Sequence, residues 1–316
     1  EKLGVAYFAV AYTKEGVALR NAGIRSPILV LHPQPLHFET IIERCLEPAI
    51  YSARILREFV AIAEEKTQQN YPVHIKFNTG LNRLGFWEGD CSFIASKLKE
   101  TSSVFVKSMY SHLVASEDMA EEKFTLHQIS TFNKIVAEMK GLLGYSPMVH
   151  QSNTSGLLNY SNAHHDMVRT GIGLYGFGNS AEINTQLKPV ATLKSVISQI
   201  HKIEPQETVG YNRAYTASGY EKTATIPIGH ADGISRAYGK EKGWVTIHGQ
   251  KAPIIGNVCM DMLMVNVTDI ACAEGDEVII FGENPTASEL SEAIGSIPYE
   301  LLTAISQRVQ RVVTRR

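Results

Sequence analysis

The stretch that decides the fold runs from residue 104 to residue 153. It begins with VFVKSMYSHL (104–113), continues with AEEKFTLHQISTFNKIVAEMKG (120–141) and ends with MVHQSN (148–153). The outer two segments have the composition of strands, and the middle one has the spacing of a helix with Gly141 as its C-cap. A strand, a helix and a second strand in this order predict a βαβ unit with parallel strands.

The same alternation extends over the first part of the chain. Another helix is predicted from Ala53, and seven strands are predicted in all, at 5–10, 28–32, 49–52, 73–77, 104–113, 148–153 and 168–176. A closed (β/α)8 barrel of the TIM type requires eight strands. We therefore expect either an open sheet or a barrel whose first strand is absent from this chain.

The pattern changes after Leu187. Alternating strand segments separated by turns follow, and two short helices are predicted near the end, the first with Thr286 or Ser288 as its N-cap. This pattern is typical of a mostly antiparallel β domain. We expect an incomplete α/β barrel over 1–187 and a β domain over 188–316.

Composition limits the classes of partner. The 316 residues contain 30 Lys and Arg and 32 Asp and Glu, a formal net charge of −2. A nearly neutral chain lacks the field that concentrates polyanions, so neither nucleic acid nor an anionic membrane is expected as a partner. No apolar run is long enough for a membrane span, no secretory pattern opens the chain, and four scattered cysteines form no CxxC. Cytoplasmic localisation is therefore expected.

Several polar residues stand where strands end. His112 ends one predicted strand, and His150, Asn153 and Thr154 end the next. Polar residues at the carboxyl ends of barrel strands are typical of an active site, although a single histidine there is more often a structural hydrogen bonder. No HxH or HExxH spacing accompanies them, and no metal is expected.

Three basic residues occupy unusual positions. Arg83 follows a strand in a glycine-bracketed loop, where its guanidinium is placed to grip a carboxylate or phenolate oxygen. Lys76 lies within that strand. If its amine is buried, it must be paired, neutral or modified. Otherwise the side chain extends to solvent. Arg169 lies in an apolar segment, where it requires a partner or a ligand.

GIGLYG, at 171–176, matches the G-x-G-x-x-G dinucleotide pattern. No crossover helix and no acidic residue about 20 positions further on accompany it, so we reject dinucleotide binding. The exposed N–H groups of such a turn suit a phosphate, and a simple tight turn is an equally good interpretation. In the β domain, Cys259 precedes Met260 and Asp261 in a tight turn, and no neighbouring histidine makes it a nucleophile.

Together these segments resemble the alanine racemases, which are fold type III enzymes that use pyridoxal 5'-phosphate. The likeness covers essentially the whole chain, through LNRLGF, YSHL, HxxNT, VRTGIG, VGY, CMD and IPYE. It implies that Tyr211 is a catalytic base, that His112 bridges the arginine at the pyridine nitrogen to this tyrosine, and that Arg83 touches the cofactor phenolate and the substrate carboxylate. Lys76 matches a lysine that is often carbamylated.

The resemblance also implies the cofactor and substrate contacts. Arg169 is the expected partner of the pyridine nitrogen. The expected phosphate ligands are Asn153, Thr154, Gly171, Ile172 and Tyr299, with Thr154 in place of the family's serine. Met260 and Asp261 are expected to face the substrate. Since the family places the tyrosine and the methionine in the partner's active site, a homodimer with shared sites is expected.

Two departures from the family are visible. His230 stands where many relatives have a tyrosine at the substrate entrance. The motif AVVKAxAYG, which carries the lysine that binds the cofactor, is absent from these 316 residues. We expect this chain by itself to be inactive.

The resemblance implies interconversion of L- and D-alanine by two-base proton transfer on a pyridoxal phosphate aldimine, supplying D-alanine for peptidoglycan. Two alternatives stay open. One is another fold type III racemase or decarboxylase, acting on serine, lysine or ornithine. The other is a non-catalytic protein that binds pyridoxal phosphate, although such a carrier would lack Tyr211 and the β domain.

Overall fold

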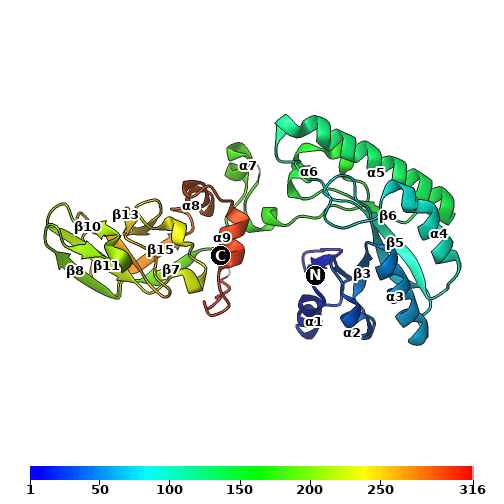
Figure 1. Ribbon diagram of the computed structural model, residues 1–316, viewed down its shortest axis with the longest axis horizontal. Helices are drawn as coiled ribbons and strands as arrows, with labels where there is room; N and C mark the ends of the chain where they lie inside the picture. The colour runs from blue at the N-terminus through cyan, green and yellow to red at the C-terminus, as the bar shows by residue number, and fades with distance from the viewer. Residues whose placement is uncertain (179, 315–316) are drawn as a thin grey trace. The chain divides into compact units, whose positions relative to one another are not determined.

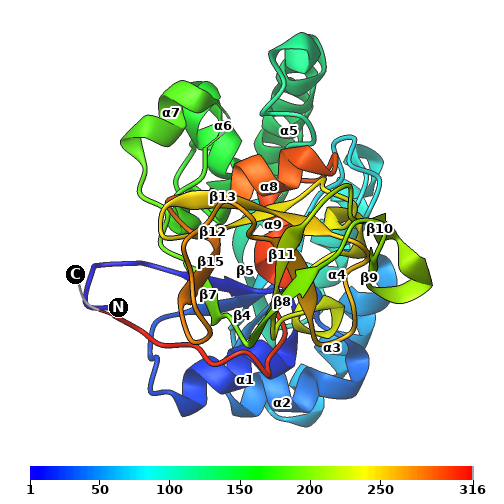
Figure 2. The same ribbon diagram turned by 90° about the vertical axis from the view of Figure 1, so that its left-hand side faces the viewer.

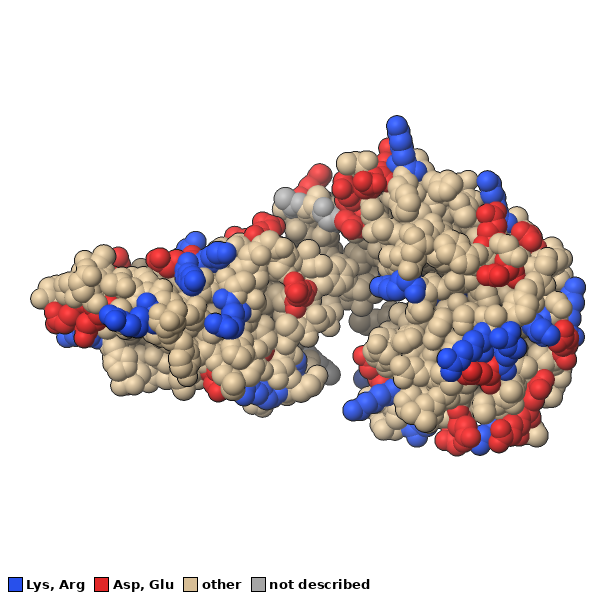
Figure 3. All heavy atoms as spheres, viewed as in Figure 1, with Lys and Arg blue, Asp and Glu red and all other residues tan. Residues whose placement is uncertain are grey.

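A computed structural model describes residues 1–178 and 180–314. The chain divides into two compact units, Glu1–Gly173 and Leu174–Arg316 (Figure 1). Among the described residues, no helix combines the length and the apolar character that crossing a membrane requires. On the face that Figure 3 shows, acidic and basic side chains lie among one another.

Strands and helices alternate in the first unit. Its elements are β1 (Phe8–Val10), α1 (Thr13–Asn21), β2 (Ile28–Val30), α2 (Phe38–Glu43), β3 (Glu47–Ile50), α3 (Ala53–Glu65), β4 (Tyr71–Lys76), α4 (Cys91–Lys99), β5 (Val104–Tyr110), α5 (Glu122–Leu143), β6 (Met148–His150) and α6 (Thr154–Asn159). The six strands pair in parallel in the order β1-β2-β3-β4-β5-β6, and α1 to α5 lie along the outer face of the curved sheet (Figure 1). Sequential parallel pairing is the strand order of a barrel wall.

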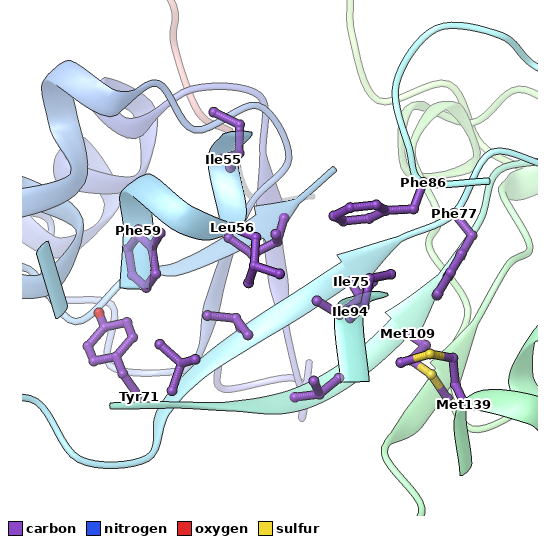
Figure 4. Packing of buried hydrophobic residues seen from close by; sticks show 14 of the residues in the cluster. Ile55, Leu56, Phe59, Tyr71, Ile75, Phe77, Phe86, Ile94, Met109 and Met139 are labelled. Atoms are coloured by element: carbon purple, nitrogen blue, oxygen red, sulfur yellow. The ribbon is translucent and has the colours of Figure 1, made fainter. Parts of the chain in front are cut away.

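The main core of this unit lies between the sheet and its helices. Helix α3 begins at the N-cap Ser52, whose hydroxyl accepts a hydrogen bond from the Ile55 amide, and it buries Leu56 and Phe59. Figure 4 shows these side chains in one cluster with Ile75 of β4. Burying a side chain such as Phe59 contributes roughly 1.5–3 kcal/mol, so this packing fixes the outer face of the sheet.

The second unit is antiparallel (Figure 2). Its elements are α7 (Ala181–Gln186), β7 (Leu193–Val196), β8 (Gln199–Ile203), β9 (Thr208–Val209), β10 (Tyr215–Thr216), β11 (Glu221–Ile226), β12 (Trp244–Ile247), β13 (Gln250–Ile255), β14 (Leu263–Asn266), β15 (Glu277–Phe281), α8 (Ala287–Ala293) and α9 (Pro298–Ala304). Seven strands form one sheet in the order β7-β15-β12-β13-β14-β11-β8, and β9 pairs with β10. Thr286 is the N-cap of α8. The predicted fold class, an α/β domain followed by an antiparallel β domain, is confirmed.

Two local predictions are wrong. The segment 168–176 forms no strand: Met167 makes a single bridge to His150, and a short 3₁₀ turn, Ile172–Tyr175, follows. The N–H groups of Gly171 and Gly173 donate to the Thr154 hydroxyl, so they are not available to a strand partner.

The end of α5 also differs from the prediction. The helix continues past Gly141 to Leu143, and the C-cap is Gly144, with φ of 76°. Leu142 and Leu143 pack against the core, and this contact extends the helix beyond the first glycine. Gly144 adopts the left-handed conformation that glycine tolerates best.

Candidate active site

Strand β4 places Lys76 at its carboxyl end, and the Arg83 loop follows. Lys76 is 5% exposed, so the buried interpretation of this residue is correct. Desolvation, together with the charges of Arg83 and Arg169, lowers the pKa of Lys76 to about 8. An amine with such a pKa is partly neutral near physiological pH and can act as a nucleophile.

The loop is closed by backbone hydrogen bonds. The Phe86 amide donates to the Lys76 carbonyl over 2.9 Å, and the Asn78 amide donates to the Phe86 carbonyl over 2.8 Å. Inside the loop, Asn78 Oδ1 accepts hydrogen bonds from the amides of Gly80 and Asn82. The Arg83 side chain is exposed at the tip. This ladder presents Arg83 to a ligand with little freedom in the backbone.

Replacing Gly85 with alanine is expected to disrupt this loop. Its φ is +133°, and a Cβ would lie 2.6 Å from the Asn78 nitrogen and 2.7 Å from the Phe77 carbonyl carbon. We expect a loss of about 2 kcal/mol or more in the free energy of unfolding, measured by urea denaturation. Gly89→Ala is the matched control, because a Cβ there meets nothing within 4 Å. Equal midpoints for the two variants would contradict this account.

Arg169 is the centre of the site in the first unit. Its Nη2 donates to the Ser111 carbonyl (2.8 Å), the Gln151 carbonyl (2.9 Å) and His112 Nδ1 (3.2 Å). Its Nη1 lies 2.5 Å from His150 Nδ1. Among the hydrogen bonds of the described residues, none uses Arg169 Nε. The Arg169 guanidinium is therefore held in place, and its Nε–H can still be donated to a ligand.

The two histidines beside Arg169 are held neutral. Desolvation, followed by the charge of Arg169, lowers the pKa of His112 to about 3 and that of His150 well below its usual range. Desolvation also lowers the pKa of Arg169 to about 10, which still leaves it protonated at neutral pH. The Tyr110 ring stacks on His150 at 4.8 Å and lies 5.2 Å from the guanidinium carbon. Arg169 is thus a permanent cation beside two neutral imidazoles.

Asn153 and Thr154 organise the glycine-rich turn. Asn153 Oδ1 caps α6 by accepting the Gly156 amide, and Thr154 Oγ1 accepts the amides of Gly171 (3.1 Å) and Gly173 (3.3 Å). A Cβ on Gly173 would lie 3.0 Å from both the Thr154 methyl and the Thr170 hydroxyl. The turn therefore lies directly against Thr154.

The remaining predicted residues lie in the second unit. Gly210, at φ of 77°, turns the chain into Tyr211, whose side chain is 72% exposed. The turn predicted around Cys259 is present, since the Cys259 amide donates to the Met262 carbonyl. Tyr211, Met260 and Asp261 line one cavity of about 660 Å³. This unit therefore brings the expected base and the two expected substrate contacts together.

His230 and Tyr299 lie elsewhere in that unit. His230 is exposed and lines a different cavity, with Ser235 and Tyr238. Tyr299 lies on α9 and is 46% exposed.

The sequence analysis missed Arg308. Its Nε donates to Asp232 Oδ1 and its Nη2 donates to Asp261 Oδ1, each over 2.6 Å. The two aspartates lie in loops 76 and 47 residues before Arg308 in the sequence. Asp232 Oδ2 also accepts the Gly229 amide. The hydrogen bond to Arg308 holds the pKa of Asp232 below its ordinary value. Arg308 thereby steadies the turn that carries Met260 and Asp261, and no local motif signals this role.

Comparison with known proteins gives the family. The profile described as "Alanine racemase, N-terminal domain" matches residues 1–178, and "Alanine racemase, C-terminal domain" matches residues 190–313. The chain belongs to the alanine racemase family. It is 35% identical to an alanine racemase of Thermodesulfovibrio yellowstonii, over 98% of this chain and 82% of that protein.

Solved structures of alanine racemases are also similar to this chain. The Clostridium difficile 630 structure matches with a TM-score of 0.90 and 33% identity, over 98% of this chain and 81% of that one. The Bartonella henselae structure, which has covalently bound pyridoxal phosphate, matches with a TM-score of 0.86 and 26% identity, over 98% and 86%.

Proposed function

We propose that this protein is a pyridoxal phosphate-dependent isomerase that interconverts L- and D-alanine and supplies D-alanine for peptidoglycan. The observation that carries the proposal is Arg169, a cation held by two carbonyls and two neutral histidines with its Nε–H free of the described hydrogen bonds. Membership of the family over nearly the whole chain supports it.

The residues of the site fit pyridoxal phosphate. Arg169 would donate to the pyridine nitrogen without giving up its proton, because its pKa of about 10 stays above physiological pH. The phosphate would be bound by Asn153, Thr154, the N–H group of Ile172 and the hydroxyl of Tyr299, and the Gly171 N–H would bind it in exchange for its hydrogen bond to Thr154. When bound, the cofactor withdraws electrons from the substrate Cα and so makes its hydrogen acidic.

The protein's own groups would orient the substrate and move the proton. Arg83 would bind the carboxylate, while Met260 and Asp261 would face the substrate. Tyr211 would exchange the Cα proton on the L face, and inversion requires a second base on the opposite face. His112, kept neutral, would join Arg169 to the partner subunit's Tyr211 by hydrogen bonds.

The test of this function is a panel of amino acids given to the full-length protein with pyridoxal phosphate. Chiral chromatography should show L-alanine and D-alanine converging on equal amounts. Faster conversion of serine, lysine or ornithine, or release of an amine and carbon dioxide, would contradict alanine racemisation.

The expectation that the 316 residues alone are inactive stays a prediction. It is tested by borohydride reduction in the presence of pyridoxal phosphate, followed by mapping of any labelled lysine.

We also propose a homodimer in which Tyr211 and Met260 complete the partner's site. Arg83→Ala and Tyr211→Phe subunits, each inactive as homodimers, should regain about one quarter of wild-type activity when co-expressed, since half of the dimers would contain one intact site. Heterodimers without activity would contradict shared sites.

The expected cytoplasmic location and the division of the chain at Leu187 stay predictions. The gap between the two profile matches, at 179–189, supports the division.

Lys76 is expected to carry a carbamate. Its amine, with a pKa of about 8, would attack dissolved carbon dioxide, forming an N–C bond and releasing one proton. The resulting anion would pair with the cationic Arg83 and orient it. Carbon-13 NMR in labelled bicarbonate should show a carbamate signal that disappears in Lys76→Arg and persists in Lys107→Arg. A wild-type spectrum without this signal would contradict the modification.

A further inference from the structure

Four polar side chains form a row behind Arg169, one from each of four adjacent strands. They are His150 of β6, Ser108 of β5, His74 of β4 and Glu47 of β3. His150, Ser108 and His74 are 0% exposed, and the Glu47 side chain is 12% exposed. The strand register sets His74 directly opposite Ser108. We name these four residues the Glu47 relay.

Short contacts connect the relay from end to end. Arg169 Nη1 lies 2.5 Å from His150 Nδ1, and His150 Nε2 lies 2.9 Å from Ser108 Oγ. Ser108 Oγ lies 2.5 Å from His74 Nδ1, and His74 Nε2 lies 2.7 Å from Glu47 Oε2. All four contacts are close enough for hydrogen bonds, and the two at 2.5 Å are shorter than usual.

The chemistry of the two ends fixes the direction of every bond except the one between Ser108 and His74. A guanidinium can only donate, so His150 Nδ1 must accept and the His150 proton must be on Nε2. That proton is donated to Ser108 Oγ, and the single serine proton is then donated to His74 Nδ1. His74 in turn donates from Nε2 to the Glu47 carboxylate, which can only accept when ionised.

Other protonation states satisfy the row less well. A doubly protonated His74 would donate to Ser108 from Nδ1, and the serine proton would then lack an acceptor among the contacts of this fully buried residue. A buried donor without a partner destabilises the folded state. Two neutral imidazoles, each protonated on Nε2, use every group in the row.

Resting on the function proposed above, we propose that Glu47, His74 and Ser108 are positioning residues that hold His150 as a permanent acceptor for Arg169. Through this relay the Glu47 carboxylate fixes which guanidinium N–H groups are used by the protein and which face the cofactor ring. Tyr110, stacked on His150 with only 5° between the ring planes, prevents the imidazole from tilting out of line. The hydrogen bonds of the relay polarise one another and so also favour the charged form of the Arg169 guanidinium.

Histidine tautomers measure the relay directly. In the ¹⁵N-histidine-labelled full-length protein, long-range ¹H–¹⁵N correlation spectra at pH 7.5 should show His74 and His150 neutral and protonated on Nε2. Ser108→Ala removes both central bonds and leaves Arg169 and Glu47 in contact with their histidines, so the tautomers should persist while the ¹⁵N shifts of His150 Nε2 and His74 Nδ1 move to those of nitrogens without a hydrogen bond. Ser103→Ala is the matched control: Ser103 is 2% exposed, and its hydroxyl contacts Thr101 outside the relay.

Two substitutions of Glu47 separate its hydrogen bond from its charge. In Glu47→Gln the amide oxygen can still accept from His74, so the tautomers should remain as in wild type. In Glu47→Leu the His74 tautomer should be lost. In kinetics, Ser108→Ala and Glu47→Leu should lower kcat roughly tenfold with little change in KM for alanine, and Glu47→Gln should restore most of it.

The outcomes separate the relay from the proposed function. A wild-type His150 protonated on Nδ1, or Ser108→Ala with unchanged kcat and unchanged ¹⁵N shifts at His150 Nε2 and His74 Nδ1, would overturn the relay whatever the reaction. Predicted tautomers in a protein without racemase activity would instead contradict the proposed function and, with it, the positioning role. If Glu47→Leu does not fold, Ser108→Ala and Glu47→Gln still decide the result.

Discussion

Replacing Tyr211 with phenylalanine is expected to lower kcat/KM for racemisation of L-alanine by about 10²–10⁴-fold, the range for loss of a general base. The substitution removes only the hydroxyl, and the Asn257 side chain donates to the Tyr211 backbone carbonyl, which the variant retains. The side chain is 72% exposed, so folding should be unaffected. Coupled assays of alanine in both directions measure the effect.

Tyr220→Phe is the matched control for this variant. Tyr220 lies in the same unit, is 75% exposed and does not line the cavity shared by Tyr211 and Met260. It should retain wild-type rates. A Tyr211→Phe enzyme within threefold of wild type would exclude Tyr211 as a base.

Arg169→Lys is expected to have the largest effect on stability. The guanidinium reaches four acceptors on two segments of the chain, 111–112 and 150–151. A lysine ammonium keeps the charge but not the planar fork, so two or more acceptors would lose their donor. We expect a loss of about 2–4 kcal/mol in the unfolding transition of the first unit, followed by tryptophan fluorescence in urea.

The same variant should also bind pyridoxal phosphate about tenfold more weakly in an absorbance titration. Arg54→Lys, which changes an exposed arginine that pairs with Glu58 on the same helix, should leave both the urea midpoint and cofactor binding unchanged. A midpoint for Arg169→Lys equal to that of this control would contradict the structural role of Arg169.

Much of the fold could be predicted because local patterns agreed with tertiary packing. The periodicity from Ala53 predicted α3, which buries the apolar face that the pattern indicates. The segment at 168–176 misled because apolar residues and glycines resemble a strand, whereas the Thr154 hydroxyl holds its backbone. Gly141 misled because Leu142 and Leu143 gain core contacts that a local cap rule does not include.

The site was predictable where single residues are unusual in their segments. Lys76 within a strand and Arg169 in an apolar stretch required partners on physical grounds, and the structure provides neutral histidines and carbonyls around Arg169. The Glu47 relay was not predictable, because its links depend on the register between neighbouring strands. An alternating strand with one polar residue facing inward, as at His74, is the signal that could have indicated it.

The most direct test of the central claim is solvent exchange at Cα. The full-length protein, with pyridoxal phosphate, is incubated with L-alanine in D₂O, and both enantiomers are separated and analysed by mass spectrometry. Two bases on opposite faces predict that L-alanine converts to an equal mixture and that the D-alanine formed carries deuterium at Cα. L-alanine that stays unconverted, or D-alanine that retains the original hydrogen, would contradict two-base alanine racemisation.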